Sequence, residues 1–346
     1  MNEAVLKAGL NALHYSGVSE ALAPMTRGMG VIFMLHHIAP ASGKAFDPNG
    51  LLSITPDFLA ASVKRVRERG WDIVSIGEAV DRLEAGPSPN ARPFAVFTID
   101  DGYRDNLTEA YPVMKAANAP FTVYVTSALP QGEAELWWIT LEEVIAKNPV
   151  IEFQDEVIAC DSIEGKHAAW AQLYPIIRMA PEDQQRAMVR DLAARYGVSQ
   201  QEICAREAMT WDEVRKLGSD PLVTIGAHTV NHFAVVKLDA ARARAEMDEG
   251  AQAIARETGK KPQHFAYPYG DRASAGPRDF AIASELGFKS AVTTRKGMLT
   301  SQHRDHLFAL PRVALNGNLQ ALHYVDVLLS GAPFFLFNGL KLTVTA

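Results

Sequence analysis

Residues 93–102 read PFAVFTIDDG, an almost wholly apolar run that ends in two adjacent carboxylates and a glycine. A continuous apolar run of this length is typical of a buried parallel strand, which delivers side chains to the mouth of an α/β sheet or barrel. Adjacent side chains at a strand end point in different directions, so one of Asp100 and Asp101 can bind a metal while the other moves a proton. Asp-Asp-Gly is also a common turn, so the motif needs a partner elsewhere in the chain.

A pair of histidines with metal-ligand spacing provides that partner, His228-Thr229-Val230-Asn231-His232. The pair follows another apolar run, Leu222 to Ile225, and Gly226. One carboxylate and two imidazoles suit zinc or a similar divalent ion, and three protein ligands leave a coordination position open, as in catalytic sites. An HxxxH pair alone is often two surface or core histidines. An acid and a histidine pair that both follow predicted strands favour a metal site.

A third segment, residues 264–271, reads HFAYPYGD. Together with TIDDG at 98–102 and HTVNH at 228–232, in this order and spacing, it resembles the polysaccharide deacetylases, the NodB-like domain of carbohydrate esterase family four. The resemblance covers roughly Val31 to Leu315. It implies a distorted (β/α) barrel and a metal-dependent hydrolase that cleaves carbon–nitrogen bonds other than peptide bonds.

The resemblance also implies roles for individual residues. Asp100 is the expected general base, and Asp101, His228 and His232 are the expected ligands of a divalent metal, zinc first, with cobalt, nickel or manganese as alternatives. The backbone N–H of Tyr269 is expected to stabilise the tetrahedral oxyanion of the reaction.

This chain departs from the family pattern at the residue that tunes the base. Many relatives carry an arginine where this sequence has Ala266, and we expect Arg312 of the last predicted strand to replace it. The family's Asp/Trp motif is not evident around residues 290–297.

The general acid is a second departure, because the family's Leu-x-His motif is not evident near Leu315. His36, at the end of the first predicted strand, is the preferred site residue, with its role left open. His303 and His306 in a late loop are alternatives, and each is as readily explained as a core or surface histidine.

Composition sets limits on partners and location. The chain has 346 residues, is 48% hydrophobic and carries a net charge of −6, so nothing suggests a nucleic-acid partner. Its two cysteines do not form a disulfide framework. The first residues lack a signal-peptide pattern, and no apolar window reaches the roughly 18 to 20 residues of a membrane span, so we expect a cytoplasmic protein.

Predicted strands and helices alternate along most of the chain, which predicts parallel pairing and an α/β fold, either layered or a barrel. A count of about seven strands is consistent with a barrel, and the resemblance implies that this barrel is distorted. The expected parts are a helical extension at 1–30, the barrel at 31–318 and an apolar tail at 319–346. The alternation breaks at about 130–208, where we expect an inserted helical lobe. That lobe is either a cap that shapes the substrate site, with Trp137 or Trp138 stacking on a sugar, or a structural embellishment.

The apolar tail, with Pro333 to Phe337 at its centre, predicts packing on the core or a dimer contact; peripheral membrane attachment is the alternative.

For function, the leading prediction is an N-deacetylase acting on an amino-sugar polysaccharide, oligosaccharide or lipid-linked glycan precursor. The alternatives are a deformylase or other amide hydrolase with the same fold and metal, and a catalytically weak carbohydrate-binding or assembly module. Retention of Asp100 argues against the last, because a binding protein needs no general base.

Overall fold

The computed structural model describes residues 3–345. A parallel sheet forms its centre, and neighbouring strands follow one path of seven, with β4 pairing to the first residues of β5. Leu310 also bridges to Val292 of β11, so the two ends of the path approach each other. The predicted distorted barrel is therefore confirmed. In path order the strands are β11 (Ser290–Val292), β10 (His264–Ala266), β9 (Val223–Ala227), β6 (Phe121–Val125), β5 (Phe94–Ile99), β1 (Gly30–Leu35) and β12 (Val313–Ala314), with β4 at Asp72–Ile73.

The central strands are buried along their whole length, as expected of parallel strands covered on both faces. Every residue of β5 and β6 is buried. The register pairs Leu35 with Ile99, so His36 and Asp100 leave their strands at the same level. Ala227, the last residue of β9, pairs with both Val125 and Phe265. The three sequence motifs therefore reach one end of the barrel together.

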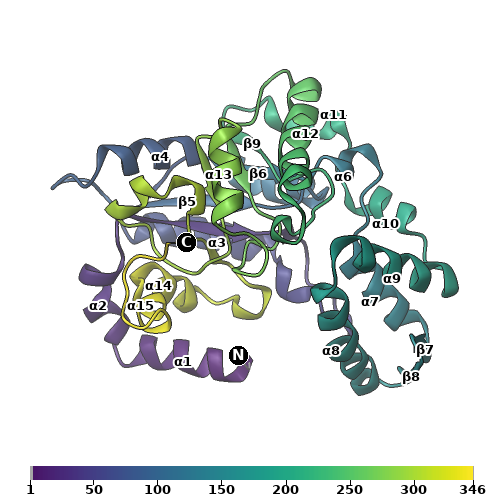
Figure 1. Ribbon diagram of the computed structural model, residues 1–346. Helices are drawn as coiled ribbons and strands as arrows, with labels where there is room; N and C mark the ends of the chain where they lie inside the picture. The colour runs from purple at the N-terminus through teal and green to yellow at the C-terminus, as the bar shows by residue number, and fades with distance from the viewer. Residues whose placement is uncertain (1–2, 346) are drawn as a thin grey trace.

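Helices cover the outside of the sheet, and their starts follow local rules. Thr55 caps α3 by accepting from the N–H of Phe58 (3.2 Å), and a capping box of Thr210 and Glu213 begins α11. Figure 1 shows α11, α12 and α13 on one side of the strands. The helices of the barrel are α3 (Pro56–Glu68), α4 (Ile76–Ala85), α5 (Tyr111–Ala116), α6 (Ala128–Gln131), α11 (Trp211–Gly218), α12 (Ala240–Thr258) and α13 (Pro277–Glu285).

The inserted lobe lies beyond the strand ends (Figure 1), and it has its own apolar core. Its four helices are α7 (Trp137–Lys147), α8 (Ile163–Met179), α9 (Glu182–Arg195) and α10 (Gln200–Glu207). The inserted lobe is mainly helical, as predicted, but it also contains an antiparallel hairpin that the sequence did not indicate, formed by β7 (Val150–Phe153) and β8 (Glu156–Ala159). The sequence there alternates buried and exposed residues over only four positions, too few to distinguish a strand from a loop.

Two other elements of the barrel are irregular. The helical segment after β5 begins as a π-helical turn, Asn106–Ala110, and only then becomes α5, with Pro112 in its first turn. The strand β4 has only two residues, Asp72 and Ile73, and pairs with the start of β5. A further pair of two-residue strands, β2 (His37–Ile38) and β3 (Ser53–Ile54), lies between β1 and α3.

The two ends of the chain pack together. Helices α1 (Glu3–Tyr15) and α2 (Val18–Thr26) contact α14 (Leu322–Ser330), and α15 (Ala332–Phe337) also contacts α2 (Figure 1). Much of the predicted apolar tail is thus buried against the chain itself, while Leu336 and Phe337 stay exposed. Both cysteines are buried and free. No helix within residues 3–345 has the length and apolar content to cross a bilayer.

Candidate active site

The three predicted metal ligands meet at the mouth of the barrel. Oδ1 of Asp101 lies 3.3 Å from Nε2 of His228 and 3.2 Å from Nε2 of His232. One ligand atom from each residue lies within 4.8 Å of the others, and all three residues are buried. Residues far apart in sequence converge here because β5 and β9 both end at this edge of the barrel.

These three side chains fit a divalent cation. Oδ1 of Asp101 is buried without a hydrogen-bond donor, although it faces two imidazole nitrogens. Such an orphaned acceptor is unfavourable unless a cation or proton lies between it and the nitrogens. Two nitrogens and one carboxylate oxygen are also the donor set found in catalytic zinc sites.

Charge and burial keep Asp101 and His232 in the protonation states that bind metal. Burial raises the pKa of Asp101, but the neighbouring His232 and His228 outweigh it and bring that pKa well below its ordinary range. Burial lowers the pKa of His232 to about 4, so its imidazole is neutral near pH 7. A carboxylate and a neutral imidazole are the forms that bind metal.

The two histidines are held differently. Nδ1 of His228 lies 2.6 Å from the backbone oxygen of Ala266, which leaves Nε2 free to face Asp101. This backbone contact is the usual second interaction of a metal-ligating histidine. Nδ1 of His232 is buried and has no hydrogen-bond partner within the described residues.

Asp100, the predicted base, is paired with Arg312. The guanidinium donates to both carboxylate oxygens, Nη1 to Oδ1 at 2.7 Å and Nη2 to Oδ2 at 2.6 Å. Arg312 is itself fixed, because it also donates to Oγ1 of Thr98 (3.1 Å) and to the carbonyl of Thr293 (2.9 Å). Burial raises the pKa of Asp100, but the bidentate arginine outweighs it and holds that pKa below its usual range. The structure thus brings Arg312 to the base from the segment before β12. This is the arginine that we expected to replace the one missing at Ala266.

His36 also faces the site, whereas its neighbour does not. Nε2 of His36 lies 4.0 Å from Oδ2 of Asp100, and burial lowers the pKa of His36 despite the attraction of Asp101 and Asp100. His37 points elsewhere: its Nδ1 lies 2.7 Å from Asp105, and its ring stacks on Tyr103 at 3.7 Å between centroids.

Tyr269 is held from the lobe. Its hydroxyl accepts from Nε1 of Trp137 (2.7 Å), and the guanidinium of Arg178 lies 3.7 Å from its ring centroid. In this turn Gly270 donates to the carbonyl of Pro268 (2.7 Å), and Oγ1 of Thr294 donates to the carbonyl of Tyr269 (2.6 Å). Neither of these hydrogen bonds uses the N–H of Tyr269.

Strained backbone gathers at this site. Asp101, Thr229, His232 and Tyr269 all have positive φ, at 77°, 64°, 58° and 62°. Non-glycine residues seldom adopt this region, and such strain persists only where the surrounding structure determines it. The clustering of these conformations on the three motifs supports a functional role for them.

A cavity of about 290 Å³ contains these groups. Its lining includes His36, Asp100, Asp101, His228, His232 and Tyr269. The lobe contributes Trp138, Tyr174 and Arg178, and the loop after β1 contributes Asn49 and Leu52. Sequence reasoning missed all of these except Trp138, because residues of an insertion and a loop carry no strand-end signal. Trp137, by contrast, is core.

Two other features lie apart from the site. His303 is buried, accepts at Nδ1 from the N–H of Thr300 (2.9 Å), and lies with Nε2 3.0 Å from the carbonyl of Val344. Neither His303 nor His306 lines the cavity.

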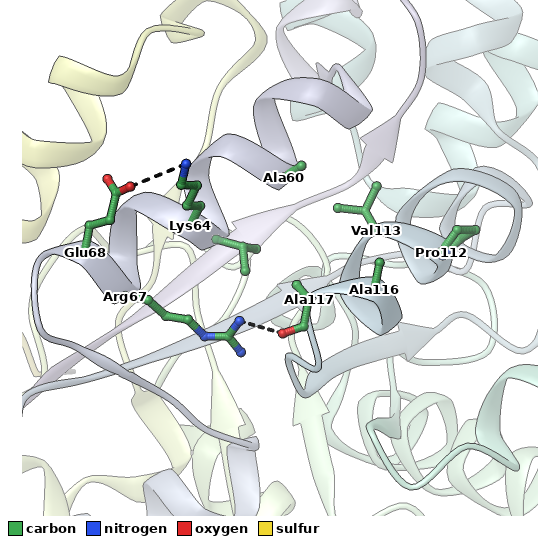
Figure 2. A pocket seen from close by; sticks show the side chains of 9 residues that line it. Ala60, Lys64, Arg67, Glu68, Pro112, Val113, Ala116 and Ala117 are labelled. Carbon is green, nitrogen blue, oxygen red and sulfur yellow. Dashed lines mark hydrogen bonds and ion pairs between the residues drawn. The ribbon is translucent and has the colours of Figure 1, made fainter.

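Figure 2 shows a groove on the outer surface between α3 and α5, with Ala60, Val113 and Ala116 along it and the Lys64–Glu68 ion pair at one end. It contains none of the predicted site residues.

Residues 165–291 match the family model of the polysaccharide deacetylases. That range includes His228, His232 and Tyr269 but not Asp100, Asp101 or Arg312. No curated protein matches the sequence.

Solved structures match over most of the chain. The Streptococcus pyogenes deacetylase PplD in complex with acetate is 17% identical, with a TM-score of 0.58 over 86% of this chain and 97% of its own. IcaB from Ammonifex degensii is 16% identical, with a TM-score of 0.55 over 88% and 97%. A de-N-acetylase from Aggregatibacter actinomycetemcomitans is 16% identical, with a TM-score of 0.54 over 86% and 99%. Identities this low show a common fold, and with the family match they confirm the resemblance to the polysaccharide deacetylases.

Proposed function

We propose that this protein is a metal-dependent hydrolase that removes N-acetyl groups from an amino-sugar polysaccharide, oligosaccharide or lipid-linked glycan precursor. One observation carries the proposal: an arginine-paired carboxylate, Asp100, lies beside the Asp101–His228–His232 cluster in a single cavity. The family match supports the deacetylase class of this reaction.

Asp100 is the group that takes a proton from the attacking water. Its low pKa keeps it ionised near neutral pH, and Arg312 fixes both oxygens so that the carboxylate cannot rotate away. A carboxylate positioned in this way contributes about 10² to 10⁴ to the rate. A divalent cation held by Asp101, His228 and His232 would polarise the acyl carbonyl and acidify water.

Tyr269 and His36 also have roles in the proposed reaction. The N–H of Tyr269 would donate to the oxygen that becomes negative when water adds to the acyl carbon. His36, 4.0 Å from Asp100, is the nearest imidazole to the base outside the metal cluster, and because burial lowers its pKa it would act as a neutral group that polarises the site. The products would be acetate and a free amino sugar.

The substrate contacts are proposed from the cavity walls. At about 290 Å³ the cavity lies at the small end of the range for ligand sites, which suits one sugar ring and its acyl group. Trp138 and Tyr174 line the side of the cavity that the inserted lobe forms, and their aromatic rings suit the apolar face of a sugar.

Measurement of acetate and formate release from a panel of N-acetylated and N-formylated amino sugars and oligosaccharides tests the proposal. We expect acetate, with Asp100→Asn as the inactive control. Formate alone would identify a deformylase, and neither product would favour the binding module.

Metal content is tested separately. Elemental analysis should find about one divalent ion per chain, lost in His228→Ala and retained in His264→Ala, which removes a buried histidine outside the cluster. Equal metal content in His228→Ala and the parent would disprove the ligand assignment.

A further inference from the structure

The segment from His228 to Ala234, here called the metal loop, contains two of the three proposed ligands. Thr229 and His232 both have positive φ, and the N–H of His232 donates to Oγ1 of Thr229 (3.0 Å). A strained loop needs outside contacts to keep its shape.

His232 depends on such contacts most. A metal-ligating histidine usually fixes its ring through a hydrogen bond from the other nitrogen. His228 has that contact with Ala266, but Nδ1 of His232 is buried and unpartnered within residues 3–345. The ring instead packs between Trp138 of the lobe and Tyr269, with centroids 4.9 Å and 4.7 Å away. The direction of its Nε2 is therefore set by packing and by the backbone of the metal loop.

Helix α12 holds the metal loop from the barrel side. Oε2 of Glu246 accepts from the N–H groups of Val230 (3.1 Å) and Asn231 (2.9 Å), and Oε1 accepts from the side-chain amide of Asn231 (2.7 Å). One turn later Gly250 lies so close that a Cβ there would sit 2.7 Å from the Thr229 carbonyl. The helix thus contacts the loop with no space for an added methyl group.

Helix α9 of the inserted lobe holds the other end. Nη2 of Arg186 donates to the carbonyl of Asn231 (3.0 Å), and Oε1 of Glu182 accepts from the N–H of Ala234 (3.1 Å). Both side chains are buried, and Arg186 also lies 5.2 Å from the ring centroid of Phe233. Asn231 is therefore bonded at its N–H and side chain by the barrel and at its carbonyl by the lobe.

We infer that the inserted lobe is part of the metal site: α9 and α12 together fix the metal loop, which makes Arg186, Glu182 and Glu246 positioning residues for His232. This inference rests on the proposed metal-dependent function. It gives the lobe a role other than that of a cap or an embellishment, because removal of its contacts should weaken metal binding even without substrate.

The test is the zinc dissociation constant of the full-length protein, measured by competition with a chromogenic chelator and without substrate. Loss of an outer-shell partner of a metal ligand typically weakens metal binding about 10- to 100-fold. We expect losses of this size for Arg186→Met and Glu246→Ala. Two matched controls should bind zinc like the parent: Arg190→Met, an exposed arginine of α9 bonded to Glu135, and Glu249→Ala, an exposed acid of α12.

Thermal melts of the metal-free proteins separate positioning from general damage. Two changes are compared for each variant: the fall in the melting temperature of the metal-free protein, and the fall in the stabilisation that added zinc produces. The inference requires the second change to be larger than the first. If Arg186→Met does not fold, Glu182→Ala tests the lobe side and Gly250→Ala the barrel side. Zinc affinity within twofold of the parent in the folded lobe variant would overturn the inference and leave the proposed function standing. A parent protein that binds no divalent metal would overturn both.

Discussion

The ion pair between Asp100 and Arg312 should be the most sensitive element of this site, and Arg312→Met tests it. Methionine retains much of the buried volume but removes all four hydrogen bonds that Arg312 donates: two to Asp100, one to Thr98 and one to Thr293. Removing one partner of a buried pair costs about 3–5 kcal/mol, because the other charge stays buried and unpaired.

The same substitution should change the ionisation of the base. In the parent, Arg312 outweighs burial and keeps the pKa of Asp100 below its ordinary range, so the pair stabilises the fold above the pKa of an unfolded aspartate. This contribution is lost as the pH falls through the lower folded pKa. Without Arg312, burial alone raises the pKa of Asp100. A loss of about 3 kcal/mol corresponds to an upward shift of about two pH units in the acidic limb of kcat/KM.

Urea unfolding at several pH values and a pH–rate profile measure both effects. We expect Arg312→Met to be destabilised most near neutral pH and less in acid, where Asp100 becomes protonated. Arg304→Met, at an exposed arginine before the same strand, is the control. Asp100→Asn combined with Arg312→Met should recover part of the stability but none of the activity. An Arg312→Met protein with parental stability and an unmoved acidic limb would refute the coupling between arginine and base.

The remaining predictions concern single side chains. Asp100→Asn should keep the metal and lose about 10² to 10⁴ in kcat, measured by product release and elemental analysis. A variant that loses the metal instead would show that Asp100 is the metal ligand and Asp101 the base. His36→Ala should lower kcat at least about tenfold in a protein that still shows a parental thermal melt, whereas His303→Ala should affect stability more than kcat, since its ring is bonded to Thr300 and Val344. His264, buried beside Ser290, has its pKa lowered by burial to about 4. The unfolded chain therefore takes up that proton first as the pH falls from about 6.5 to 4, and stability should drop by about 3 kcal/mol over that window. Urea unfolding of His264→Gln should show a flatter pH dependence, and an unchanged slope would contradict the buried neutral state.

Chemically distinctive residues at strand ends were predictable because they lie next to apolar runs that fold locally into strands. Asp100, Asp101 and His228 follow such runs directly, and His232 was marked by its spacing from His228; parallel strands deliver their carboxyl ends to one edge. Three of them, Asp101, His228 and His232, have ligand atoms within 4.8 Å of one another in the structure. Arg312 was also within reach, since it adjoins the last strand of the same barrel.

The lobe could not be predicted in the same way. Its hairpin, β7 and β8, is too short for a clear period, and the wall residues Tyr174 and Arg178 lie on a helix without any strand-end signal. Which of two adjacent tryptophans faces the site depends on how the lobe packs: Trp137 is core and bonds Tyr269, whereas Trp138 lies against His232.

The sequence by itself therefore determined the barrel, the metal-ligand candidates and the base, because each is encoded by a local pattern and by the common direction of parallel strands. Only the tertiary structure decided how the ligands are held. Glu246 and Arg186 lie 15 and 45 residues from Asn231, on two different helices, and nothing in either local sequence marks their contact with the metal loop. Buried hydrogen bonds of this kind depend on the packed arrangement of the whole chain, which sets partners by distance in space and not along the sequence.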